Sequence, residues 1–141
     1  MSPRTTGRVP GSPEEWMSHA ASDLRLAHLA AGDESIRREQ VCFHAQQAAE
    51  KAIKALLLSR SIEFPLTHDI EELLEIAESS GISLPADVRE AGLLNPYAVE
   101  SRYPGYWFEI TEADLAEAMQ SAERTLAWAA AEIESLRKPE S

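Results

Sequence analysis

The chain has 141 residues, 44% hydrophobic and 26% charged, and its 24 acidic side chains outnumber 13 lysines and arginines to give a net charge of −11. This length and composition suit one globular domain that folds without a metal or disulfide, and the single cysteine, Cys42, excludes an intramolecular disulfide and a cysteine metal cluster. The negative net charge argues against nonspecific binding of nucleic acid. The sequence has no apolar run of about 20 residues and no apolar signal-peptide core, so we expect a cytoplasmic protein.

The two ends of the chain lack the pattern of the rest. Residues 1–11 are rich in Pro, Gly, Ser and Thr and show no apolar periodicity, and the last few residues are similar. Such terminal segments are rarely ordered. We expect a disordered tail over residues 1–11, one helical domain over residues 12–138 and a second tail over residues 139–141.

A first helix is predicted to begin after Ser12. Ser12 can act as the N-cap, Pro13 suits the first helical position, and Glu15 completes a capping box. Apolar residues then recur three and four positions apart, at Met17, Ala20, Leu24, Ala27 and Ala31. Gly32 with Asp33 should end this helix.

A second, longer helix is predicted from Ser35 to Ser59, with two faces that differ. One stripe at helical spacing is made almost entirely of alanine: Val41, Ala45, Ala48, Ala52 and Ala55. Small side chains let another backbone approach closely, so this stripe is a reason to expect a homodimer. The other side carries a polar line, His44, Gln47, Lys51 and Lys54.

Two shorter helices are expected next. Asp69 with Glu72 forms a capping box for the third helix, and Gly81 supplies its C-terminal stop. Pro85 opens a fourth helix, which Asn95-Pro96 should interrupt. Its inward side is predicted to carry Val88, Ala91 and Leu94.

The last helix, capped by Thr111 and Asp114, has the most regular pattern. Its apolar residues alternate four and three apart, at Leu115, Met119, Ala122, Leu126, Ala129, Ile133 and Leu136. This heptad-type seam is typical of long helices that pack nearly parallel in a bundle. No strand pattern of convincing length occurs, so the sequence predicts an all-α fold, an antiparallel up-and-down bundle of four to five helices.

The segment between the last two helices carries Arg102 among three tyrosines, Tyr97, Tyr103 and Tyr106. A guanidinium suits a planar anion such as phosphate, and tyrosines add stacking faces and hydroxyl donors. These residues indicate a nucleotide or RNA-phosphate site. The alternative is structural, with the arginine paired to a carboxylate and the tyrosines packing the segment onto the bundle.

His68 and Lys51 are two further candidate ligand residues. His68 precedes Asp69 at a predicted helix start. It either makes a local hydrogen bond beside the Asp69 cap or is a polar group of a cleft that it shares with Arg102. Lys51, in the polar line with His44, either faces solvent at an interface edge or faces phosphate in a dimer groove. No metal is expected, because no two histidines have metal-ligand spacing, and no cofactor is expected, because a Gly-rich phosphate loop is absent.

The order of three motifs resembles the HEPN family of small helical domains, particularly the stand-alone prokaryotic type often paired with a minimal nucleotidyltransferase. The motifs are AQQAAEKAIKALL from Ala45, THDI from Thr67 and RYP from Arg102. The resemblance implies an antiparallel helical bundle that commonly dimerises. Many HEPN domains are metal-independent ribonucleases whose active pair is an arginine and a histidine separated by four to six residues. By position, Arg102 matches that arginine.

The chain departs from this pattern where the histidine belongs. The corresponding positions hold Trp107, Phe108 and Glu109, and no histidine follows Arg102 anywhere. A histidine near neutral pH suits the proton transfers of metal-free RNA cleavage, and its loss removes on the order of 10²- to 10⁴-fold of rate. In some pairs the nucleotidyltransferase adds AMP to a tyrosine of the HEPN protein shortly after the histidine. The resemblance places that tyrosine at Glu109 of this sequence, and Tyr103 does not occupy the matching position.

Three functions therefore remain in view. The first is a binding or regulatory module that partners a minimal nucleotidyltransferase and holds a nucleotide near Arg102. The second is a metal-independent ribonuclease toxin of a toxin–antitoxin pair, using Arg102 with Tyr103 or His68. The third is a structural helical dimer in which the Arg102 segment serves folding. The missing histidine and the acidic composition favour the first.

Overall fold

A computed structural model describes residues 10–98 and 109–137 of the chain. Arg102, Tyr103 and Tyr106 lie outside the described residues, as do most of the two predicted tails. The described chain forms six helical elements and no strand, namely α1 (Pro13–Ala31), α2 (Arg38–Ser59), α3 (Ile70–Ser79), α4 (Ala86–Arg89), the 3₁₀ helix η1 (Glu90–Tyr97) and α5 (Glu112–Arg137). The prediction of an all-α bundle is confirmed.

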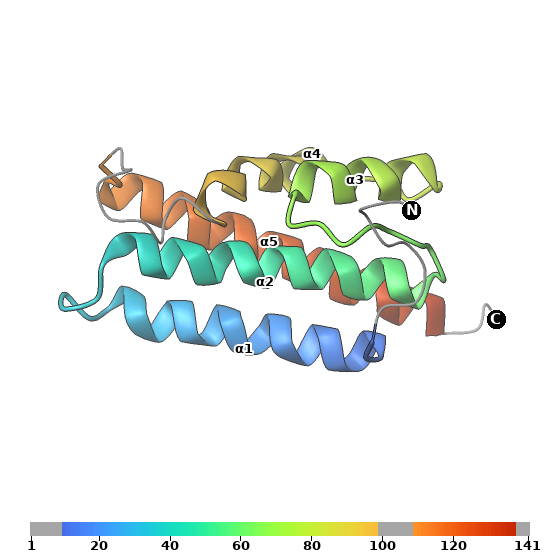
Figure 1. Cartoon of the computed structure of the whole chain (residues 1–141), viewed down its shortest axis with the longest axis horizontal. Helices are drawn as coiled ribbons and strands as arrows, with labels where there is room; N and C mark the ends of the chain where they lie inside the picture. The colour runs from blue at the N-terminus through green and yellow to red at the C-terminus, as the bar shows by residue number, and fades with distance from the viewer. Residues whose placement is uncertain (1–9, 99–108, 138–141) are drawn as a thin grey trace, which may run out of the picture.

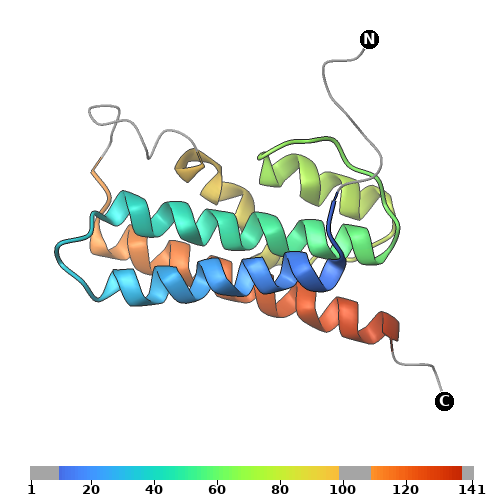
Figure 2. The same cartoon turned by 60° about the horizontal axis from the view of Figure 1, so that its bottom comes forward.

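Helix α2 lies at the centre of the bundle. It packs along α1 and α5, while α3 and η1 cover it from another side (Figure 1). The short connection after α1 makes α1 and α2 run in opposite directions (Figure 2). The α4–η1 segment leads back toward the end of the bundle where α5 begins. Polar groups from α1, α3 and η1 can therefore meet on the surface of α2.

The predicted helix starts are formed by the predicted side chains. Ser12 and Glu15 exchange hydrogen bonds of 2.8 and 3.1 Å between side chain and backbone, as a capping box requires. Thr111 and Asp114 make the same reciprocal pair, both at 3.0 Å. Asp69 caps α3 by accepting from the backbone N–H of Glu72 at 3.3 Å.

Helix α2 begins at Arg38, three residues later than the sequence indicated. The Asp33 side chain accepts from both the backbone N–H and the hydroxyl of Ser35, at 2.9 and 2.6 Å. Such an Asx turn offers the backbone an alternative to helical hydrogen bonds. The helix consequently starts after the turn.

The predicted fourth helix is a short α4 followed by the 3₁₀ helix η1, which runs through Pro96 to Tyr97. Proline removes a backbone donor, and it disfavours the α conformation of the residue before it, here Asn95. The predicted inward residues of this region are all buried: Val88, Ala91 and Leu94. The helix changes from α to 3₁₀ at Glu90 and continues through Pro96, so this proline does not end it where expected.

The alanine stripe of α2 is buried inside the single chain. None of its five residues is more than 1% exposed. The small side chains let α1 and α5 approach α2, so this stripe offers no free surface to a second copy. The homodimer stays a prediction and needs another surface. In the part of the chain that the structure covers, no helix has the length and apolarity to cross a bilayer.

Candidate functional site

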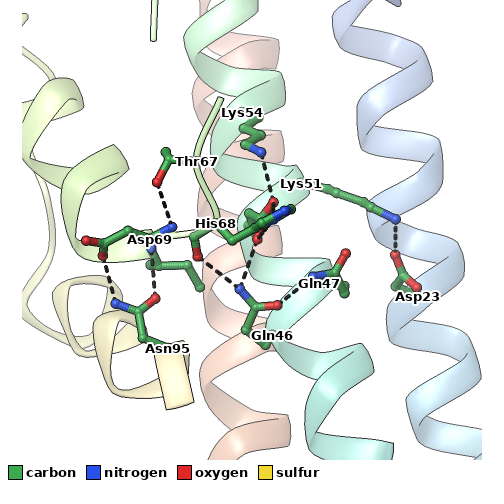
Figure 3. A network of polar contacts seen from close by, with 11 residues as sticks. Asp23, Gln46, Gln47, Lys51, Lys54, Thr67, His68, Asp69 and Asn95 are labelled. Atoms are coloured by element: carbon green, nitrogen blue, oxygen red, sulfur yellow. Dashed lines mark hydrogen bonds and ion pairs between the residues drawn. The ribbon is translucent and has the colours of Figure 1, made fainter. Parts of the chain in front are cut away.

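A buried carboxylate organises the polar face of α2. Glu50 is 2% exposed, and Figure 3 shows the polar network to which its partners Gln46, Lys54 and His68 belong. It accepts hydrogen bonds from Lys54 Nζ at 2.8 Å and from Gln46 Nε2 at 3.0 Å. His68 Nδ1, from the segment before α3, lies 3.1 and 3.0 Å from the two carboxylate oxygens. A charged group removed from water needs such partners, and Glu50 has them.

The segment before α3 is fixed by its own polar groups. Asp69 Oδ1 accepts from Asn95 Nδ2 at 2.8 Å, and Asn95 Oδ1 accepts from the backbone N–H of Ile70 at 2.8 Å. The hydroxyl of Thr67 accepts from the backbone N–H of Asp69 at 3.1 Å. The carbonyl of His68 accepts from Gln46 at 3.4 Å. The THD motif is thereby joined to both α2 and η1, which orients the His68 imidazole.

A second carboxylate joins α1 to the other edge of the polar line. Asp23 accepts from Lys51 Nζ at 2.6 Å and lies 3.1 Å from His44 Nδ1. The Lys51, His44 and Lys54 side chains are 24%, 28% and 7% exposed. These side chains are therefore less open to solvent than a solvated polar face would be. Asp23 of α1 supplies the counter-charge for Lys51 and His44, and Glu50 of α2 supplies it for Lys54.

Tyr97 is buried at the end of η1, 8% exposed, and shares a hydrogen bond with the Cys42 thiol. Burial, followed by the nearby carboxylate of Asp114, raises the pKa of Cys42 to about 12. Burial also raises the pKa of Tyr97 to about 12. Both groups are therefore protonated at neutral pH. The phenol packs into the core here, which leaves little of it for contact with a ligand.

The five predicted ligand residues thus have different surroundings. His68 is held by Glu50, Lys51 by Asp23, and Tyr97 by Cys42. Arg102 and Tyr103 lie outside the described residues. Reasoning from the sequence missed Gln46, Glu50 and Asn95. A signal existed for Glu50, since Lys54 follows it at i+4, the spacing at which a glutamate and a lysine on one helix form an ion pair.

A groove of about 950 Å³ lies at the end of the bundle, between the α1–α2 connection and the start of α5. Arg38 crosses it to donate to the carbonyl of Ile110 at 2.7 Å, while Arg37 pairs with Glu39 at 2.8 Å. Carboxylates outnumber these two arginines among the lining residues, which include Asp33, Glu34, Glu39, Glu109 and Glu112. The described walls of the groove would repel a phosphate.

The match to known families covers almost the whole described bundle. Residues 13–133 match the model of the HEPN domain. This chain belongs to the HEPN family. The AQQAAEK and THD motifs of this HEPN chain meet at Glu50 and His68, so at least part of the family pattern reflects one structural network.

Two solved structures resemble this HEPN chain closely. The crystal structure of ST0689, described as an archaeal HEPN homologue, is 34% identical, covers 88% of this chain and 99% of its own, and has a TM-score of 0.71. The crystal structure of TT1696 from Thermus thermophilus is 30% identical, covers 85% and 97% of the two chains, and has a TM-score of 0.74. Among curated proteins, none matches this chain.

The titratable side chains of the described residues do not gather into a metal site. No group of three or more histidine, cysteine, aspartate or glutamate side chains is placed to hold an ion there. Glu50 and Asp23 are instead each occupied by one lysine and one histidine. The chemistry that these two clusters offer is hydrogen bonding and proton exchange.

Proposed function

We propose that this HEPN domain is a binding and regulatory module that partners a minimal nucleotidyltransferase and holds a nucleotide. The observation that carries the proposal is that no histidine follows Arg102 in the sequence. A guanidinium without a neighbouring imidazole binds phosphate well but offers no group to exchange protons near neutral pH. Arg102 and Tyr103 would contact the phosphate.

Charge supports a specific protein partner over a nucleic-acid scaffold. The net charge of −11 repels a polyanion, and Lys51 and Lys54 are both neutralised by carboxylates of the same chain. A single nucleotide needs far fewer cations than a polyanion, and Arg102 supplies one. In this proposal the buried Tyr97 anchors the start of the segment that carries Arg102. His68 is the exposed polar group available to the nucleotide.

Co-expression tests the partner. The full chain is produced together with a nucleotidyltransferase encoded beside its gene, and the complex is isolated through a tag on the transferase. We expect a stable complex and, by calorimetry, AMP binding that Arg102→Ala abolishes. A chain that elutes alone and binds no AMP contradicts the proposal. Intact-mass analysis of the same sample shows whether Tyr103 or another residue has gained AMP.

A second candidate is a metal-independent ribonuclease of a toxin–antitoxin pair that uses Arg102. One observation favours it, namely that His68 is exposed and oriented by a carboxylate, as a proton-transfer group must be. Incubation with labelled RNA in the presence of a chelator separates the candidates. Cleavage that Arg102→Ala removes supports the ribonuclease, whereas intact RNA supports the binding module.

A further inference from the structure

His68 combines an exposed side chain with a buried anchor. Its imidazole is 70% exposed, whereas the Glu50 side chain that holds it is 2% exposed. The backbone on either side is fixed by Asp69 and by the Gln46 contact to the His68 carbonyl. An exposed histidine normally samples several rotamers, but this one is held in one orientation from the ring and from the main chain.

The contacts of Glu50 determine which ring nitrogen of His68 carries the proton. Lys54 and Gln46 donate to the two different oxygens of the carboxylate, so both oxygens of Glu50 act as acceptors. His68 Nδ1 must then be the donor at 3.0 Å. A neutral imidazole has one N–H, so its Nε2 atom carries a lone pair. Within the described parts of the chain, the hydrogen bonds of this ring all run through Nδ1, which leaves Nε2 to a ligand.

An Nε2 lone pair selects ligands that can donate a hydrogen bond. A phosphate group is negatively charged and largely deprotonated at neutral pH, so it is a poor donor, and the carboxylate of Asp69 next to His68 disfavours an anion. The described neighbours of His68 are polar groups, from Thr67, Asp69 and Gln46, which suit a hydroxylated sugar better than a flat base. A ribose hydroxyl has the required proton and polarity.

We propose that His68, oriented by Glu50, contacts the ribose of a bound ribonucleotide by accepting a hydrogen bond from a sugar hydroxyl at Nε2. The inference rests on the nucleotide-binding role proposed above and adds which part of the nucleotide lies at the THD motif. His68 is the ligand-contacting residue, and Glu50 is a positioning residue that fixes the tautomer. The phosphate lies elsewhere, away from these carboxylates.

Calorimetric titration of the full chain with AMP, 2′,3′-dideoxy-AMP and inorganic phosphate tests the assignment. One net hydrogen bond changes affinity by roughly three- to tenfold, so AMP should bind that much more tightly than the dideoxy analogue. His68→Ala should abolish the difference and leave the affinity for inorganic phosphate unchanged. His19→Ala, at an exposed histidine of α1, is the matched control and should keep the difference.

Each outcome has a defined meaning. If AMP binds but His68→Ala keeps the preference for AMP over the dideoxy analogue, the ribose contact is overturned and the nucleotide-binding role stands. If AMP does not bind, both fail. Weaker binding of inorganic phosphate to His68→Ala would instead make His68 a phosphate contact and overturn the inference. His68→Phe, which keeps a ring of similar size but has no acceptor, gives the same comparison should the alanine variant unfold.

The tautomer can be checked without a ligand. Imidazole ¹⁵N shifts distinguish a protonated Nδ1 from a protonated Nε2, and we expect the signal of His68 to show Nδ1–H with an unprotonated Nε2. The Nε2–H tautomer in the neutral protein would overturn the inference directly. Glu50→Gln should release this preference, since an amide can donate to Nδ1 as well as accept from it.

Discussion

Glu50 and Lys54 form an ion pair inside the bundle, one helical turn apart on α2. Lys54 Nζ lies 2.8 Å from Glu50 Oε2, and the two side chains are 7% and 2% exposed. The ammonium also lies 5.7 Å from the centroid of the Trp16 ring on α1, within range of a cation–π interaction. Three parts of the fold therefore meet at one pair of opposite charges: α1, α2 and, through His68, the segment before α3.

Replacing Lys54 by Met should destabilise the fold strongly. The substitution keeps the length of the apolar stem but leaves the Glu50 carboxylate buried without its full counter-charge. Breaking a buried pair by removing one partner costs about 3–5 kcal/mol in the free energy of unfolding. Urea denaturation at pH 7 measures this loss.

Lys51→Met is the matched control for Lys54→Met. Lys51 is on the same helix and pairs with Asp23, but its side chain is 24% exposed and water can hydrate what remains. Partly exposed pairs contribute about 1 kcal/mol or less. A loss at Lys54 no larger than at Lys51 would show that Glu50 is not sealed from solvent. The double variant Glu50→Leu/Lys54→Met should recover much of the loss, because no lone charge then remains.

Asn95 should stabilise the start of α3. Asn95→Ala removes the acceptor for the backbone N–H of Ile70 and the donor to Asp69. An unsatisfied buried backbone donor costs about 1–3 kcal/mol, which urea denaturation would show. Asn95→Asp keeps the acceptor but sets a carboxylate against Asp69, so its stability should be intermediate at pH 7 and improve as the pH falls. Equal stability of both variants and the parent would contradict this role.

The helix boundaries show which parts of the fold follow from local chemistry. Capping at Ser12, Asp69 and Thr111 depends on residues three apart in the chain, so the sequence alone locates these helix starts. The start of α2 was missed because the Asx turn of Asp33 competed with the helix. The 3₁₀ helix through Pro96 was missed for a different reason, since a proline signals an interrupted α-helix without indicating which structure replaces it.

The polar network depends on contacts that no local pattern reports. His68 and Glu50 are 18 residues apart, and Asn95 and Asp69 are 26 apart. The sequence marked His68 and Asp69 as a helix-start pair, but only the packing of α3 and η1 on α2 brings these side chains to Glu50 and Asn95. The alanine stripe shows the same limit. Its pattern predicts close helix packing, but it does not distinguish packing within the chain from packing between chains.

Enlarging the alanine stripe should disrupt the fold of the single chain. Ala52 is fully buried, so Ala52→Leu inserts three extra carbons into a filled core, at a cost of typically 1–3 kcal/mol. Ala21→Leu, at an exposed position of α1, is the control and should leave stability nearly unchanged. The loss at Ala52 should be independent of protein concentration. A loss that fades on dilution would instead place the stripe at a subunit contact.

Alkaline pH should destabilise the fold through Cys42 and Tyr97. The unfolded thiol and phenol ionise near their ordinary values of 9.0 and 10.0, whereas burial raises the pKa of each in the folded chain to about 12. Between these values the unfolded state binds fewer protons than the folded state, so stability falls as the pH rises. This contribution is complete below about pH 9 and is lost progressively as the pH approaches about 12.

Cys42→Ala separates this effect from other alkaline titrations. The variant lacks the thiol, so its free energy of unfolding, measured in urea at intervals from pH 8 to pH 11, should fall less steeply than that of the parent. The buried thiol should also react slowly with a thiol reagent at pH 8 in the folded chain and rapidly in urea, since the thiolate is the reactive form. Parallel stability profiles together with rapid labelling of the folded chain would contradict a raised pKa for Cys42.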